Sequence, residues 1–265
     1  MTAAADPGAS VSRRAFVRMA GGAALSAALP GCGTDLVGSG GAPPRGARLT
    51  ARPGEPTTEA QPGIGWIDLN RTGRDARLCV PVGYDPETPA PLFVTLHGRG
   101  GGAADWDGFQ TACDTRGMVM LAVESRGVTW DRIGAGFYGP DVAYMDAALA
   151  LTFGRCRIDP ARVALAGFSD GASYALSLGP TNGDLFTHLV AYSPGLTAPN
   201  ELVGMPRIWV SHGRQDTVLD PDRTEQVVIR SLVDAGYLVE YVPFDGGHEV
   251  PGEIASQSLD WFLGV

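Results

Sequence analysis

The chain contains no lysine, since all 20 residues in its lysine-plus-arginine count are arginines. Chemistry that depends on a lysine amine is therefore excluded, including Schiff bases, a P-loop phosphate clamp and a Ser-Lys dyad. The sequence also lacks Cys-x-x-Cys, His-Glu-x-x-His and Asp-rich calcium-loop patterns. We therefore predict no metal site, because no recognisable ligand set is present.

Length and charge favour one acidic globular domain. Hydrophobic residues make up 44% of the chain and charged residues 18%, which excludes wholesale disorder and a polytopic membrane protein. Residues 1–31 carry a net charge of +2 within a total of −9, so the remaining 234 residues carry −11. Such a surface repels phosphate backbones and anionic lipid. We expect a monomer with no nucleic-acid partner.

The first 31 residues have the features of an export signal. Residues 12–18 (Ser-Arg-Arg-Ala-Phe-Val-Arg) precede an apolar run over 19–29 that is too short to span a bilayer. This pattern resembles a twin-arginine signal, the alternative being a stray basic cluster. Residues 29–32 (Leu-Pro-Gly-Cys) resemble a lipobox, from which Pro30 departs. We expect export to the periplasm or cell envelope, with membrane contact only through a lipid on Cys32.

Residues 32–62 are rich in Gly, Pro, Thr and Arg and have almost no large apolar side chains. Such a segment cannot offset its ordering entropy by burial, so a flexible tether is predicted, with the catalytic domain at 63–265. That domain holds Cys79, Cys113 and Cys156. In an oxidising compartment one pair could form a disulfide, and burial of all three as small hydrophobes is the alternative.

The domain alternates apolar runs with segments of helical spacing, which predicts an α/β fold with a mostly parallel sheet covered on both faces. In such sheets ligands bind at the carboxyl ends of the strands. The predicted strands are 78–82, 92–96, 118–123, 163–166, 189–192, 208–211 and 239–244, and the predicted helices are 142–153, 172–178, 223–235 and 254–262.

Residues 167–171 (Gly-Phe-Ser-Asp-Gly) lie between a predicted strand and a predicted helix. A strand that turns at once into a helix leaves no room for side chains two residues either side of the serine, and it projects the hydroxyl outward. The context predicts a nucleophile elbow at Ser169. The alternative is a glycine-rich turn with a surface serine.

A serine nucleophile needs a base, and the base needs an orienting acid. Of the four histidines, His248 follows the last predicted strand and is the predicted base. His97 is expected to support a loop, and His188 and His212 to be packing or surface residues. Asp216 follows the strand at 208–211 and is the predicted acid. Its competitors are Asp220 and Asp222, which are expected to cap a helix, and Asp245, expected on the wrong side of its loop.

A glycine-rich loop follows the strand at 92–96, with the sequence His-Gly-Arg-Gly-Gly-Gly at 97–102. Its glycines allow backbone N–H groups to approach an oxyanion. By resemblance to hydrolases with an H-G-x-G loop, the donors would be the amides of Arg99 and Asp170. A dinucleotide fingerprint is the competing interpretation, using Gly98, Gly100 and Ala103 with Glu124 beyond the next strand. It explains neither the elbow nor His248.

These motifs give residues 63–265 a resemblance to α/β-hydrolases of the predicted esterase kind, close to the phospholipase/carboxylesterase and polyhydroxybutyrate depolymerase-like groups. The resemblance rests on His97-Gly98, the elbow at Ser169, His212-Gly213-x-x-Asp216 and Gly247-His248. It implies an eight-stranded, mostly parallel sheet and carboxylic-ester hydrolysis without a cofactor. Arg99 departs from the apolar residue or glycine common in that loop.

The short connections between 166 and 248 predict no large lid, which favours small soluble esters or polyester ends as substrates. Four aromatic side chains are candidates for the acyl or alcohol pocket, with ordinary core packing as the alternative. They are Trp106, Trp130, Phe137 and Tyr138. Two other classes of function remain open: an acyltransferase with the same triad, and a catalytically silent envelope-anchored binding module.

Overall fold

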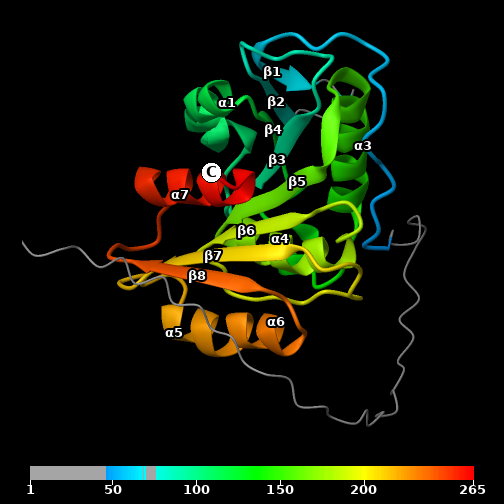
Figure 1. The fold of residues 1–265 in the computed structure, drawn as a ribbon. Helices are drawn as coiled ribbons and strands as arrows, with labels where there is room; N and C mark the ends of the chain where they lie inside the picture. Colours follow the sequence, from blue (N-terminus) through cyan, green and yellow to red (C-terminus); the bar gives the residue numbers. More distant parts are fainter. Residues whose placement is uncertain (1–45, 68, 70–75) are drawn as a thin grey trace, which may run out of the picture.

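The computed structural model describes residues 46–67, 69 and 76–265. The predicted export signal and Cys32 lie outside these residues. The described chain forms an eight-stranded sheet in the order β1-β2-β4-β3-β5-β6-β7-β8 (Figure 1). β1 and β2 are antiparallel to their neighbours, and the other pairs are parallel. The strands are β1 (Gly63–Ile67), β2 (Ala76–Val80), β3 (Ala90–Leu96), β4 (Val119–Val123), β5 (Ile158–Phe168), β6 (His188–Tyr192), β7 (Arg207–Gly213) and β8 (Val239–Phe244).

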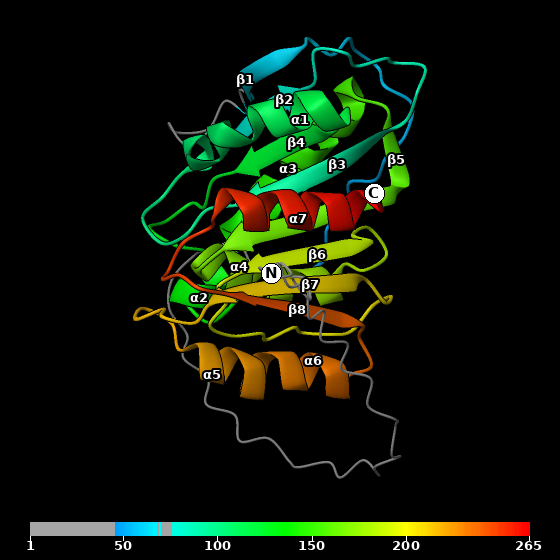
Figure 2. The same ribbon diagram turned by 60° about the vertical axis from the view of Figure 1, so that its left-hand side comes forward.

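Helical segments cover both faces of the sheet, and Figure 2 shows α7 in front of it with α3 and α4 behind. The elements are η1 (Ala103–Phe109), α1 (Gln110–Arg116), α2 (Asp131–Gly134), α3 (Pro140–Arg155), α4 (Asp170–Thr181), α5 (Pro221–Arg223), η2 (Thr224–Ile229), α6 (Arg230–Asp234) and α7 (Gly252–Leu263). The mostly parallel, doubly covered sheet predicted from the sequence is confirmed.

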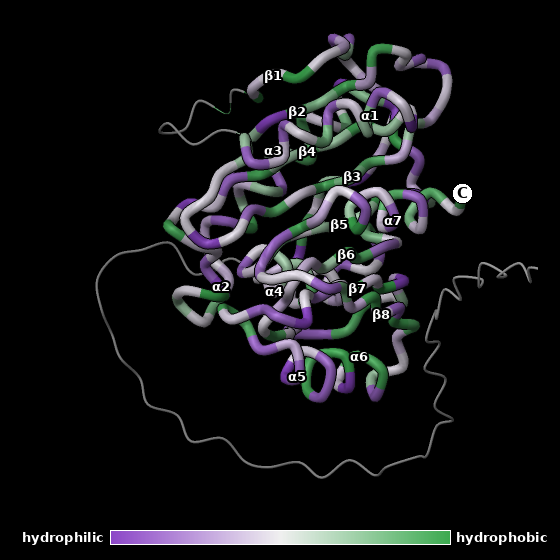
Figure 3. Tube along the Cα trace, turned by 90° about the vertical axis from the view of Figure 1, so that its left-hand side faces the viewer, coloured by the Kyte–Doolittle hydropathy of each residue, from purple (hydrophilic) through white to green (hydrophobic). Residues whose placement is uncertain are grey.

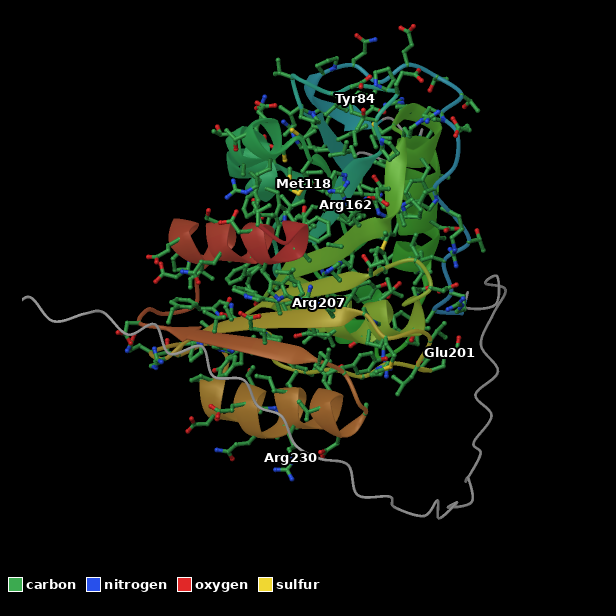
Figure 4. All side chains as sticks on the ribbon, viewed as in Figure 1. Tyr84, Met118, Arg162, Glu201, Arg207 and Arg230 are labelled. Carbon is green, nitrogen blue, oxygen red and sulfur yellow. The ribbon has the colours of Figure 1, made fainter. Side chains whose placement is uncertain are left out.

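The two faces of the sheet carry separate cores because successive side chains of a strand point to opposite sides. In β3, Leu92 and Val94 belong to the core that also contains residues of α3, α4 and α6, whereas Phe93 belongs to the core that contains residues of η1, α1 and α7. Figure 3 shows the strands as mainly hydrophobic and the outer loops as more polar. Figure 4 shows Arg230 of α6 directed away from the sheet.

The second half of the predicted tether is not free of the domain. Leu49 is buried, and its N–H donates to the buried side chain of Asn182 (2.8 Å), whose amide donates to Ala47 O (2.8 Å). Asp146 accepts hydrogen bonds from the N–H groups of Thr50 and Ala51. The flexible tether is therefore wrong for residues 46–62, because polar groups of the domain satisfy a backbone that has few apolar side chains of its own.

The three cysteines of the domain are buried and unbridged. Cys79 in β2 and Cys113 in α1 lie in one core, and Cys156 lies in the other. Here the packing alternative holds. Within the described residues, no helix has the length and apolar character needed to cross a membrane.

Candidate active site

The nucleophile elbow forms where β5 turns into α4. Ser169 has φ 57° and ψ −119°, a left-handed conformation that non-glycine residues rarely adopt. A Cβ on Gly167 would lie 2.3 Å from Gly171 O, and one on Gly171 would lie 2.3 Å from Leu96 O. Both glycines are therefore required by close backbone approach, as the sequence predicted, and Ser169 is held at the carboxyl end of the sheet.

Three side chains from distant parts of the chain meet at this edge. His248 Nε2 lies 2.8 Å from Ser169 Oγ, and His248 Nδ1 lies 2.6 Å from Asp216 Oδ2. Because a carboxylate only accepts, Nδ1 carries the proton and Nε2 presents its lone pair to the serine hydroxyl. The arrangement can take a proton from Ser169 and hold the resulting imidazolium beside a negative charge.

Asp216 is fixed by backbone as well as by His248. Its Oδ1 accepts from the N–H groups of Val218 (2.8 Å) and Leu219 (2.9 Å). Burial works to raise the pKa of Asp216, but the hydrogen bonds from Leu219, His248 and Val218 outweigh it, and the pKa lies below its usual value. The acid is therefore ionised at neutral pH.

The loops that carry the acid and the base are bound directly to each other. Arg214 N–H donates to Phe244 O and Gln215 N–H donates to Gly246 O, both at 2.9 Å. A Cβ on Gly213 would lie 2.2 Å from Gly247 O, so only glycine allows the two loops to approach this closely. The distance between Asp216 and His248 is thus set by the ends of β7 and β8.

Of the competing acids, Asp220 and Asp245 are engaged elsewhere, while Asp222 lies inside α5 and does not cap it. Asp220 accepts from Asp222 N–H and caps α5, as expected, although the helix begins at Pro221 rather than at 223. Asp245 is exposed and pairs with Arg214 at 3.2 Å.

His97 supports the glycine-rich loop. Its Nε2 accepts from Ser125 N–H (3.0 Å) and its Nδ1 lies 2.6 Å from Gly98 O, while its carbonyl accepts from Trp130 Nε1 (2.9 Å). The position of a Cβ on Gly98 would be 3.4 Å from Ser169 Cβ, so this loop passes beside the serine. His97 is buried and has the structural surroundings expected of it.

The two predicted oxyanion donors are not engaged by the described part of the chain. Within the described residues, neither Arg99 N–H nor Asp170 N–H donates a hydrogen bond to another protein group. Asp170 begins α4, so its amide is one of the free donors of a helix N-terminus. The Asp170 carboxylate turns aside, accepting from Thr129 Oγ1 (2.6 Å) and lying 3.9 Å from the Arg99 guanidinium.

The acidic residue that a dinucleotide-binding site would need, Glu124, is engaged elsewhere. Glu124 is buried, and its Oε1 accepts from Ala103 N–H (3.1 Å) at the start of η1. It therefore binds the chain's own loop instead of pointing to where a ribose would lie. Within the described residues, no group of three or more metal-ligating side chains forms a candidate metal site.

His212 is the residue whose place the sequence did not predict. Expected as a packing or surface residue, it is buried, with Nε2 3.0 Å from Asp216 Oδ2 and 3.0 Å from Leu219 O. The only signal for this contact in the sequence is the spacing His-x-x-x-Asp after a strand. His188, by contrast, does pack, with its ring against Trp261 and Phe262.

The four aromatic candidates for a substrate pocket differ in their exposure to solvent. Trp106, Trp130 and Tyr138 are buried in the core, where Trp130 stacks on Tyr174 and Tyr138 packs edge-on against the same ring. For these three the core-packing alternative is correct. Only Phe137, 54% exposed, is free to contact a ligand.

A serine, a histidine and an aspartate hydrogen-bonded in series at the carboxyl edge of a parallel sheet, in the chain order Ser-Asp-His, define the triad-bearing class of α/β fold. The solved structures agree on the fold. A fluorophosphonate-binding serine hydrolase of Staphylococcus aureus, FphF, superposes with TM-score 0.61 at 13% identity, covering 77% of this chain and 99% of that one. An acetyl xylan esterase from Aspergillus awamori gives 0.59 at 15% identity, covering 77% and 100%.

Sequence comparison leads to esterases as well. Feruloyl esterase C of Emericella nidulans is 28% identical over 160 residues, which cover 57% of each chain. NocK of Nocardia uniformis, whose name assigns it provisionally to the esterases, is 28% identical over 117 residues, or 41% of this chain and 34% of that protein. The chain thus spans about half or less of these relatives' length, and no family model matches it. The chain therefore has the α/β-hydrolase fold of these solved structures, and its sequence is similar to proteins named as esterases.

Proposed function

We propose that the protein hydrolyses carboxylic esters through an acyl-enzyme on Ser169. The observation that carries the proposal is the unbroken hydrogen-bond series from Ser169 Oγ through His248 to Asp216. The similarity to proteins named as esterases supports the ester as the bond that is cleaved. Binding of an ester carbonyl beside Oγ would complete the arrangement.

In the proposed mechanism, Ser169 Oγ attacks the ester carbonyl carbon while His248 Nε2 takes the hydroxyl proton. The amides of Arg99 and Asp170 donate to the oxygen that becomes negative, and one such donor is worth roughly 3 to 4 kcal/mol in enzymes of this type. His248 then gives its proton to the leaving alcohol. Water, activated by the same imidazole, attacks the acyl-enzyme and releases the carboxylic acid and free Ser169.

We propose small soluble esters or accessible polyester ends as the substrate class. The similarity to a feruloyl esterase adds aromatic acyl groups to the candidates, with exposed Phe137 as a surface for an aromatic ring. An acyltransferase would share every step to the acyl-enzyme and differ only in an alcohol taking the place of water.

The test is a series of p-nitrophenyl esters of increasing acyl length, together with a feruloyl ester, assayed with the wild type and with Ser169→Ala. We expect hydrolysis by the wild type and loss of nearly all of it in the variant. Equal rates for the two proteins would refute the proposal. A fluorophosphonate that labels the wild type alone separates an enzyme from a silent module, and product analysis with an added alcohol separates hydrolysis from transfer.

We also propose export, on the pattern at 12–18 and on that alone. Cell fractionation of Arg13→Ala/Arg14→Ala against the wild type tests it, with retention of the variant inside the cell as the expected result. Lipidation of Cys32 is tested by detergent partition of Cys32→Ala.

A further inference from the structure

His212 is a second imidazole on the carboxylate of Asp216. Asp216 Oδ2 lies 2.6 Å from His248 Nδ1 and 3.0 Å from His212 Nε2. The side chains of both His212 and Asp216 are fully buried, at 0% exposure. The oxygen that orients the base therefore also contacts a group that solvent does not reach.

The hydrogen-bond partners of His212 determine which of its nitrogens carries the proton. Nε2 faces a carboxylate oxygen and the carbonyl oxygen of Leu219, both of which can only accept, so Nε2 is the donor. His212 Nδ1 is buried and has no hydrogen-bond partner within the described structure. A neutral ring leaves a bare lone pair there, whereas a cationic ring would bury an unsatisfied N–H.

The backbone holds His212 in this place. His212 is paired with Pro243 in the β7–β8 ladder, and Asp216 N–H donates to Gly213 O in the turn that follows. The Leu219 carbonyl that accepts from His212 belongs to the residue whose N–H donates to Asp216 Oδ1. His212 thus ties both ends of the acid loop to the end of β7.

We propose that His212 is a positioning residue for the proposed hydrolysis: its Nε2–H donates to Leu219 O and so holds the acid loop, and at 3.0 Å from Asp216 Oδ2 it offsets part of the carboxylate's charge that faces His248. The inference rests on the proposed function for its role in turnover. Asp216 Oδ2 then orients the His248 imidazole while its charge is shared between two rings.

Loss of this donor has a direction that can be derived. Without His212 Nε2–H, the carboxylate concentrates its charge on His248, and the His248–Asp216 pair takes up a proton at a higher pH. Within the described residues, His212 and His248 are the titratable groups within ion-pair distance of Asp216, and the nearby Arg214 is directed to Asp245. The acid limb of activity must therefore move to higher pH.

The experiment compares His212→Leu, which removes the donor, with His212→Gln, which keeps an N–H at a similar reach. We expect His212→Leu to lower kcat by about tenfold to a hundredfold, with KM within about twofold, and to move the midpoint of the acid limb up by about half a pH unit or more. His212→Gln should return both quantities most of the way to wild type.

His188→Leu is the matched control, because His188 is also a buried histidine but packs on α7, away from the triad. It should lower the melting temperature without moving the acid limb. Equal losses in His212→Leu and His212→Gln with an unmoved limb, or an equal displacement of the limb in His188→Leu, would overturn the proposal.

An NMR titration of the His248 ring resonances, repeated in each variant, gives a reading that needs no substrate. A displacement in His212→Leu that His212→Gln reverses supports the role of His212 even if no ester is hydrolysed, in which case only the proposed function fails. Hydrolysis with a titration curve identical in all variants would overturn the inference and leave the function standing.

Discussion

The imidazole of His248 lies against the ring of Phe168, with 4.7 Å between the ring centroids and an angle of 38° between the planes. Phe168 is the last residue of β5 and immediately precedes Ser169. Its ring contacts the imidazole of the proposed base, whose Nδ1 is hydrogen-bonded to Asp216. An aromatic pair of this kind contributes about 0.5 to 1.5 kcal/mol.

We therefore expect Phe168→Ala to lower kcat/KM for a p-nitrophenyl ester by roughly twofold to tenfold, because the imidazole gains freedom to turn away from Ser169. Phe168→Tyr, which keeps the ring, should retain most of the activity. The measurement is steady-state kinetics with circular dichroism to verify folding, and an alanine variant as active as wild type would show that the ring contact does not orient the base.

Gly213 and Gly247 offer a matched pair of substitutions on the two loops. A Cβ at 213 would lie 2.2 Å from Gly247 O, whereas a Cβ at 247 meets no atom within 4 Å. We expect Gly213→Ala to force the loops apart and lower kcat by roughly a hundredfold, since misplacement by about 1 Å has an effect of this size. Gly247→Ala should be nearly as active as wild type. Equal activity of the two variants would contradict the proposed loop contact.

Asp141, at the start of α3, makes stability depend on pH. Burial raises the pKa of Asp141 to about 6, although backbone N–H groups of Arg126 and Asp131 donate to it. In the unfolded chain its pKa is about 3.9. The protonated form is therefore favoured by folding, and its contribution is fully present below about pH 4 and is lost as the pH rises through about 6.

We expect the free energy of unfolding of Asp141→Asn to improve relative to wild type by about 2 to 3 kcal/mol between pH 4 and pH 7. Urea unfolding at a series of pH values measures the difference. Asp234→Asn removes an exposed carboxylate of α6 and should run parallel to wild type. A constant difference between Asp141→Asn and wild type across this range would show that Asp141 does not titrate as described.

Asn182 anchors the segment at 46–62 to the domain through both atoms of its buried amide. Asn182→Ala leaves the N–H of Leu49 and the carbonyl of Ala47 without partners, which costs about 1 to 3 kcal/mol for each group that stays buried. We expect a lower melting temperature and faster proteolysis within 46–62. Asp184→Asn, which weakens exposed ion pairs to the same segment, should have a much smaller effect. Proteolysis at an unchanged rate in Asn182→Ala would argue against this anchor.

Sequence patterns predicted the sheet from its apolar strands, Ser169 from the steric requirement of the elbow, and Asp216 and His248 from their positions after strands. The glycines at 167 and 171 are demanded by backbone contacts, and most of the strands between 92 and 211 contain short runs of buried apolar residues. β1 is not among the predicted strands, because the two glycines of Gly-Ile-Gly-Trp-Ile interrupt its apolar residues. α1 and η1 were missed because the glycine-rich loop before them masks the start of helical spacing.

Contacts between distant residues account for the other misses. Nothing local indicates that the backbone at 47–51 finds its partners on Asn182 and Asp146. The depth of Trp130 and Tyr138 depends on Tyr174, a residue of α4 more than 35 positions away. The sequence places His212 at the end of a predicted strand but does not predict where its imidazole lies. The contact of that ring with Asp216 depends on the conformation of the loop after β7.

α7 begins four residues after His248 and supplies Leu259 and Phe262 to the smaller core. His248 and the residues that α7 adds to that face are therefore synthesised after Ser169 and Asp216. A nascent chain can already contain Ser169 and Asp216 and yet cannot assemble the constellation. During synthesis Ser169 therefore stays without its base until the chain has been extended past residue 248.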